Sequence, residues 1–126
     1  MTCPCGSKKS YEDCCGPYLE GKKDAPTPEA LMRSRYTAFS KGDLSYIKKT
    51  MRKEALKRFN RETAAEQLKE IEYLKLDVLL SREEGNQGTV QFIVTFRFQG
   101  DEHLMSEISS FEKIKGKWYY TKGIQG

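Results

Sequence analysis

The sequence has no long apolar run, and this absence excludes a membrane-spanning helix. No stretch approaches the roughly 20 apolar residues that a span needs, and only 37% of the 126 residues are hydrophobic. The N-terminus also lacks the apolar segment that follows the charged residues of a secretory signal. We therefore expect a cytoplasmic protein, and the length favours one main domain with at most a small appendage.

Histidine is scarce as well, because His103 is the only one in the chain. A catalytic histidine pair or a Ser–His–Asp set cannot form, and the position of His103 beside Gly100 and Asp101 predicts an exposed turn. The sequence contains neither a glycine-rich phosphate loop nor a carboxylate pair at a defined spacing. It therefore identifies no catalytic residue and favours a protein that is not an enzyme.

Cysteine is absent after residue 15, so that all four cysteines lie in one short segment. Cys3, Cys5, Cys14 and Cys15 follow the pattern C-x-C, eight residues, C-C. In a reducing cytosol, thiols clustered in this way are typical of a metal site. Four thiolates suit tetrahedral zinc in a closed structural site. Disulfides, an iron–sulfur cluster and a redox role are the alternatives.

The segment C-P-C-G-S-K-K-S-Y-E-D-C-C-G resembles the SEC-C motif, the zinc-binding element at the C-terminus of the SecA translocation ATPase. The resemblance implies that the four cysteines are the zinc ligands. It also associates the segment with docking of the SecB chaperone or the ribosome. The chain has Lys8 where glycine is common in the motif, and Glu12 and Asp13 where lysines are common. These changes make the segment less basic and weaken the analogy with those partners.

Positive charge is concentrated in the first half of the chain. Residues 1–60 carry 13 basic and 7 acidic side chains (net +6), whereas residues 61–126 carry 9 and 11 (net −2). A solvated helix face is the simpler interpretation of the densest basic run, because no series of aromatic residues for base stacking accompanies it. Attachment to nucleic acid or to the ribosome is the alternative. The run comprises Lys48, Lys49, Arg52, Lys53, Lys57, Arg58 and Arg61.

The spacing of apolar residues changes near residue 73 from a helical period to a period of two. Helices are predicted over residues 27–42, 43–51 and 63–73, after a linker over 17–26. Strands are predicted over residues 74–80, 90–98, 104–114 and 118–121, separated by turns. Helices followed by an antiparallel meander predict an α+β fold in which the helices cover one face of a curved sheet.

The chain also resembles the YchJ family of bacterial proteins. Three segments carry this resemblance: Leu31-Met32-Arg33-Ser34-Arg35-Tyr36 on the first predicted helix, Glu107-x-Ser109-x-Phe111, and Trp118-Tyr119-Tyr120. The resemblance implies a SEC-C-like zinc module over residues 1–20 and a nuclear transport factor 2-like domain over residues 27–126. Helices and sheet of that fold enclose a conical cavity. Family members often have Trp at position 51, His at 106, Arg at 108 and a second SEC-C copy. This chain has Met51, Ser106, Ile108 and no further cysteine.

The candidates for lining such a cavity are Arg35, Tyr36, Glu107 and Ser109. The apolar face of the first helix brings Arg35 nearer to the core than Arg33, since residues two apart lie about 200° apart on a helix. A partly buried Arg35 needs a carboxylate, and Glu107 is the expected partner. This pair has two interpretations, a structural tie between helix and sheet or part of a ligand site.

Three hypotheses of function follow. The first is a small zinc-binding adaptor that contacts a protein partner through its SEC-C-like module. The second is a small-molecule-binding or enzymatic cup in the α+β domain, and the third is ribosome or nucleic-acid attachment through residues 48–61. Protein ligands would fill all four positions on zinc, so that the metal supplies folding free energy rather than catalysis. We expect Cys5→Ser to unfold residues 1–20 and to leave the larger domain intact.

Overall fold

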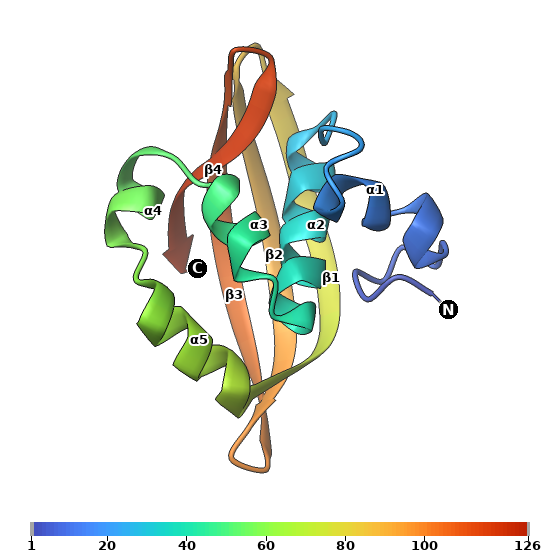
Figure 1. Cartoon of the computed structure of the whole chain (residues 1–126), viewed down its shortest axis with the longest axis vertical. Coiled ribbons are helices and arrows are strands. Elements are labelled where there is room, and N and C mark those ends of the chain that lie inside the picture. The colour runs from blue at the N-terminus through green and yellow to red at the C-terminus, as the bar shows by residue number, and fades with distance from the viewer. Residues whose placement is uncertain (1, 126) are drawn as a thin grey trace.

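The computed structural model describes residues 2–125, in which a layer of helices covers one four-stranded sheet (Figure 1). The N-terminal part contains a 3-10 turn, η1 (Tyr11–Asp13), and helix α1 (Gly16–Leu19). The helical layer continues with α2 (Pro28–Lys41), α3 (Leu44–Lys49), α4 (Lys53–Arg58) and α5 (Arg61–Glu70). None of the helices described is long and apolar enough to cross a membrane.

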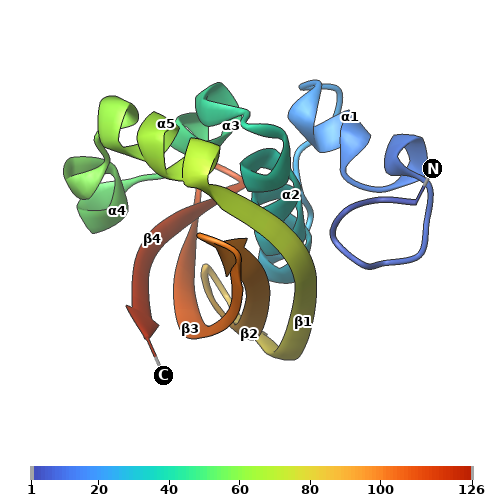
Figure 2. The same cartoon turned by 90° about the horizontal axis from the view of Figure 1, so that it is seen from below.

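The sheet is an antiparallel meander that curves around the helices. Its strands are β1 (Ile71–Glu84), β2 (Gln87–Phe98), β3 (Asp101–Ile114) and β4 (Lys117–Gln125), and they pair in sequence order. Figure 2 shows α2 lying in the concave side of the sheet, with α3, α4 and α5 beside it and the N-terminal segment outside β1. The predicted α+β arrangement is confirmed.

Helix α2 has the bounds that the sequence predicts. Thr27 accepts a hydrogen bond from the backbone N–H of Ala30, and Pro28 occupies the first turn, where no N–H is needed. Gly42 ends the helix with a φ of 76°, a left-handed conformation that favours glycine. The helix is buried on more than one side because the sheet packs against one face and the N-terminal segment against another.

The second predicted helix ends earlier than its apolar pattern indicates. Asp43 caps it as predicted, by accepting a hydrogen bond from the N–H of Tyr46. Beyond Lys49, however, the backbone turns to β4: the N–H of Tyr120 donates to the carbonyl of Thr50 at 2.8 Å. The N–H of Arg52 donates to the carbonyl of Tyr120 at 3.0 Å. These bonds replace helical ones, so that α4 starts as a separate helix.

The third predicted helix also ends early, because residues 71–73 belong to β1. Tyr73 pairs with Phe96 across the sheet, and its ring packs against Tyr36 with the centroids 5.7 Å apart. The predicted linker over residues 17–26 is likewise only partly irregular, since its first residues form α1.

Two β-bulges in β1 alter the predicted face of that strand. Val90, Phe92 and Val94 of β2 are buried on one face, as the alternation predicts. In β1, bulges between Tyr73 and Lys75 and between Val78 and Leu80 each insert one extra residue. Leu80 therefore points away from the core and is 45% exposed.

The predicted turn at His103 is wrong. His103 lies in β3, and its ring stacks on that of Phe96 with the ring centroids 5.4 Å apart.

Candidate functional site

The four cysteines converge at the N-terminal end of the chain. Their Sγ atoms all lie within 4.8 Å of one another, and all four cysteines are free. The Sγ atoms of Cys5 and Cys14 are 3.6 Å apart, and those of Cys14 and Cys15 are 3.9 Å apart. Tetrahedral zinc with Zn–S bonds of about 2.3 Å requires sulfur separations of about 3.8 Å. The cluster therefore has the ligand number and spacing of a tetrathiolate metal site.

Short backbone contacts create this convergence. The N–H of Cys3 donates to the carbonyl of Lys9 at 2.8 Å and closes a loop around the first two ligands. Gly6 turns within the loop at a φ of 83°, and its N–H donates to the carbonyl of Cys3. Ser10 then caps the turn η1, which places Cys14 and Cys15 opposite the loop.

The thiols influence one another's protonation. Hydrogen bonding with Cys15 lowers the pKa of Cys5 to about 4, against the effect of burial. The same hydrogen bond, together with burial, raises the pKa of Cys15. Burial also raises the pKa of Cys14, although the hydroxyl of Ser7 lies 3.1 Å from its sulfur. The raised pKa values keep Cys14 and Cys15 protonated without a metal, and a metal cation that displaces their protons would bind the sulfurs as thiolates.

The cysteine loop is attached to helix α2. Nη1 of Arg33 donates to the carbonyl oxygen of Cys5 at 2.8 Å, and Nε of Arg33 pairs with Glu29 at 3.0 Å. One turn further along, the hydroxyl of Thr37 lies 3.6 Å from Sγ of Cys3. Cys3 and Cys5 are buried in the same apolar cluster as residues of α2 and the sheet. The two sequence units therefore share one core.

Another side of α2 faces a cavity of about 690 Å³ between the helices and the sheet. The structure places all four candidate pocket residues in its lining, Arg35 and Tyr36 from α2 and Glu107 and Ser109 from β3. Most of the other lining residues are apolar or aromatic. They are Met32, Phe39, Met51, Gln67, Glu70, Ile71, Tyr73, Phe92, Val94, Phe96, Phe98, Met105, Phe111 and Tyr120.

Arg35 is buried at the wall of this cavity and is only 5% exposed. Its Nη1 donates to the carbonyl of Ile47 at 2.8 Å and to the hydroxyl of Thr50 at 2.6 Å. The guanidinium carbon lies 4.6 Å from the ring centre of Tyr120, in a cation–π contact. Burial lowers the pKa of Arg35 to about 10, so that the side chain is still charged at neutral pH.

The predicted ion pair between Arg35 and Glu107 is not among those that residues 2–125 form. Oε2 of Glu107 instead accepts from the hydroxyl of Ser109 at 2.6 Å and from that of Tyr120 at 3.3 Å. Because Tyr120 contacts both charged groups, it connects them indirectly. Sequence reasoning missed this role, although the position of Tyr120 two residues after the buried Trp118 places both on one face of the strand.

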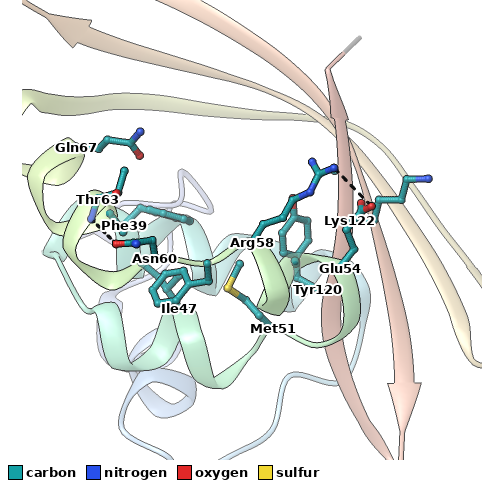
Figure 3. A pocket seen from close by; sticks show the side chains of 14 residues that line it. Phe39, Ile47, Met51, Glu54, Arg58, Asn60, Thr63, Gln67, Tyr120 and Lys122 are labelled. Atoms are coloured by element: carbon teal, nitrogen blue, oxygen red, sulfur yellow. Dashed lines mark hydrogen bonds and ion pairs between the residues drawn. The ribbon is translucent and has the colours of Figure 1, made fainter.

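A second cavity, of about 500 Å³, lies between α3, α4, α5 and β4 (Figure 3). It shares Phe39, Met51, Gln67 and Tyr120 with the first cavity. Arg58 extends toward Glu54 at one end, where the two side chains are 3.8 Å apart. The helix between the two cavities, α5, has no buried residue. The sequence contained no signal for this second cavity.

The basic run over residues 48–61 does not form one continuous helix face. Its residues are distributed over α3, α4 and the start of α5. Lys53 pairs with Glu112 at 2.6 Å, and the guanidinium of Arg52 lies 4.1 Å from the ring centre of Tyr119. With Arg58 paired to Glu54 and Lys49 placed over the ring of Tyr46, four of the seven basic side chains already have partners within residues 2–125.

Known proteins resemble this chain over almost its whole length. A family model described as YchJ, middle NTF2-like domain, matches residues 27–123, and a model of the SEC-C motif matches residues 2–17. A UPF0225 protein of Geobacter sulfurreducens is 34% identical over 124 residues, 96% of this chain and 77% of the relative. A UPF0225 protein of Deinococcus radiodurans is 38% identical over 120 residues, 94% and 85% of the two chains. The solution structure of a SEC-C motif containing protein from Rhodopseudomonas palustris, 44% identical, superimposes with a TM-score of 0.92 over 98% of both chains.

Proposed function

The chain belongs to the YchJ family, with a SEC-C motif followed by an NTF2-like domain, and we propose that it is a cytoplasmic ligand-binding protein whose fold is stabilised by zinc. The observation that carries the proposal is the double role of α2. Arg33 and Thr37 of this helix contact the cysteine loop, while Arg35 and Tyr36 line the cavity. A metal in the cysteine loop would thus fix the helix that forms one wall of the larger cavity, which is the cup expected from the sequence.

Zinc is the metal that fits the donor set. Four thiolates fill a tetrahedral shell and leave no position for water or substrate, so that the ion would stabilise the fold without taking part in chemistry. The bond from Arg33 to the Cys5 carbonyl and the contact of Ser7 with Cys14 are outer interactions of the kind that orient metal ligands.

Ligand binding is supported by the size and lining of the cup. A volume of about 690 Å³ falls in the range of about 300–1,000 Å³ that is usual for small-molecule sites. The lining is largely apolar, with a few polar groups from Arg35, Glu107 and Ser109 that converge on it. Among these groups the hydroxyl of Ser109 donates to Oε2 of Glu107 at 2.6 Å, so that the polar side chains are held in place by their own contacts while the apolar lining remains free for a ligand.

The test is a metal analysis of the tag-free protein combined with a thiol titration and a ligand screen. We expect one zinc per chain and four thiols that become reactive when a chelator is added. Thermal stabilisation by members of a metabolite panel should then disappear in Arg35→Ala. A protein without metal and with fewer than four titratable thiols would contradict the structural zinc site. A flat response to the whole panel would contradict the cup.

A second candidate function is that of a protein-interaction adaptor, and a groove beside the metal loop favours it. The groove has a volume of about 400 Å³ and lies between the loop and the start of α2. Lys9 and Asp13 on its rim are exposed and oppositely charged. A photo-crosslinking amino acid at position 9 should capture a protein partner that one at the exposed position 83 does not. Equal capture at both positions would count against an adaptor surface here.

A further inference from the structure

Part of the Arg35 guanidinium has no hydrogen-bond partner. Both hydrogen bonds that it donates within residues 2–125 come from Nη1. Nε and Nη2 make no hydrogen bond, but they are not cut off from solvent. Among residues 2–125, the solvent-inaccessible side-chain nitrogen or oxygen without a hydrogen-bond partner is Nε1 of Trp118. Because Arg35 lines the cavity, its Nε and Nη2 are accessible from there. Arg35, which is 5% exposed, therefore presents unused donors to the interior of the cup.

The charge of Arg35 also lacks a counterion in contact. The nearest candidate, Glu107, is held by Ser109 and Tyr120. A buried charge is costly unless it is paired, and the ring of Tyr120 compensates only part of that cost. An anionic group that enters the cup would complete the pair. The planar fork of Nε and Nη2 matches the two oxygens of a carboxylate better than it matches a single acceptor.

The remainder of the cup indicates what the anionic group is attached to. The wall formed by β2 consists of Phe92, Val94, Phe96 and Phe98, and Met105 of β3 continues it. Such a wall binds an aromatic ring or an alkyl chain. Glu107 of β3 and Glu70 of α5 add negative charges to the same cavity, so that a second anionic group on the ligand would be repelled.

We propose that the cup binds small organic monocarboxylates with an aromatic or alkyl body. The carboxylate is held by Nε and Nη2 of Arg35, the body lies against β2 and β3, and Glu107 selects against dianions. This inference rests on the proposed function of the cup and specifies its ligand class.

The test compares three probes of equal shape on the zinc-loaded full chain: 4-phenylbutyrate, 4-phenylbutan-1-ol and 4-phenylbutylamine. Affinities are measured by chemical-shift titration of ¹⁵N-labelled protein. We expect the carboxylate to bind at least tenfold more tightly than the alcohol and the amine. Its shifts should centre on β2, β3 and the Arg35 side chain.

Variants then attribute the preference to single residues. Arg35→Met should remove the preference for the carboxylate, whereas Arg82→Met, at an exposed position of β1 outside the lining of the cup, should retain it. Because Arg35→Met also removes two internal hydrogen bonds, Glu107→Gln provides a second reading. It should let 2-phenylglutarate bind several-fold more tightly while the binding of 4-phenylbutyrate weakens by no more than twofold.

The outcomes separate the inference from the function on which it rests. Equal binding of carboxylate and alcohol in the cup would overturn the ligand class and leave a ligand-binding cup in place. If no probe shifts residues that line the cup at millimolar concentration, the proposed ligand-binding function fails, and the inference fails with it.

Discussion

Arg33 and Cys5 are joined by a hydrogen bond of 2.8 Å, from Nη1 of the arginine to the carbonyl oxygen of a residue 28 positions earlier in the chain. The bond connects the loop that carries the first two cysteines to the middle of α2. Two residues further along, Arg35 enters the wall of the cup. The cysteine loop and the wall of the cup are therefore connected through one helix.

Removal of zinc should destabilise the whole chain, in contrast to the local unfolding that the sequence alone led us to expect. Cys3, Cys5 and Cys15 share a buried cluster with Leu31 and Trp118, so that loosening the loop exposes apolar surface of the main domain. We expect a chelator to lower Tm by at least about 5 °C, which corresponds to a loss of about 1 kcal/mol in a domain of this size.

Calorimetry, together with the near-ultraviolet signal of Trp118, measures this effect. Trp118 is the single tryptophan and is buried at the start of β4, far from the cysteines in sequence. Its signal should melt together with the far-ultraviolet signal, in one transition, before and after chelation. An unchanged Trp118 transition would instead establish that residues 1–20 unfold independently.

Arg33→Met should weaken zinc binding without unfolding the protein. The substitution keeps an unbranched apolar stem but removes the guanidinium that donates to the Cys5 carbonyl, a loss of about 1.5–3 kcal/mol for a hydrogen bond from a charged group. We expect a tenfold loss in zinc affinity, measured by competition with a chromophoric chelator. The matched control is Glu29→Gln, which breaks the ion pair of Arg33 but not its bond to Cys5. Equal effects of both variants would mean that the ion pair, rather than the tether, matters.

The features that the sequence predicted are those determined by neighbours along the chain. The cysteine spacing and the alternation of Val90, Phe92 and Val94 are local patterns, and the structure follows both. The bulge between Val78 and Leu80 is different, because it depends on how β1 fits against β2. A pattern within β1 alone cannot reveal which residue is the extra one.

The polar arrangement in the cup was predictable only in part, for the same reason. Amphipathicity assigned Arg35 and Glu107 to the same cavity, since each lies on the inward face of its own element. Their actual partners, Thr50 for Arg35 and Tyr120 for both, come from segments that meet only in the folded chain. Opposite charges alone suggested a direct pair, but the ring of Tyr120 and the carbonyl of Ile47 satisfy part of the arginine's requirements instead.

Gly123→Ala should destabilise the protein by about 1–3 kcal/mol, the usual cost of overpacking. A Cβ at this position would collide with the hydroxyl of Tyr120 and lie 2.6 Å from Oε2 of Glu107. Urea unfolding measures the loss. In a Tyr120→Phe background the hydroxyl is absent, and the same glycine substitution should cost less. Additive effects of the two substitutions would show that the Tyr120 hydroxyl does not fill the space opposite Gly123.

Stability should fall as the pH rises from about 10 to about 12. Burial raises the pKa of Tyr36, Tyr46 and Tyr120 to about 12, whereas tyrosine in an unfolded chain titrates near pH 10. In that interval the folded chain retains protons that the unfolded chain has released, so that the free energy of unfolding decreases with pH. The lowered pKa of Arg35 acts in the opposite direction, because there the folded chain releases its proton first.

Tyrosine-to-phenylalanine variants separate these opposing contributions. Each of Tyr46→Phe and Tyr120→Phe should make the decline of stability above pH 10 shallower by the equivalent of one proton, because the retained proton no longer exists. Urea unfolding at pH 9, 10 and 11 gives the slopes, and absorbance at 295 nm counts the tyrosines that ionise late. Tyr119→Phe is the control, since its neighbour Tyr120 rather than Tyr119 lines the cup. If wild type and both variants decline in parallel, then burial in the helix–sheet core does not hold these two hydroxyls protonated.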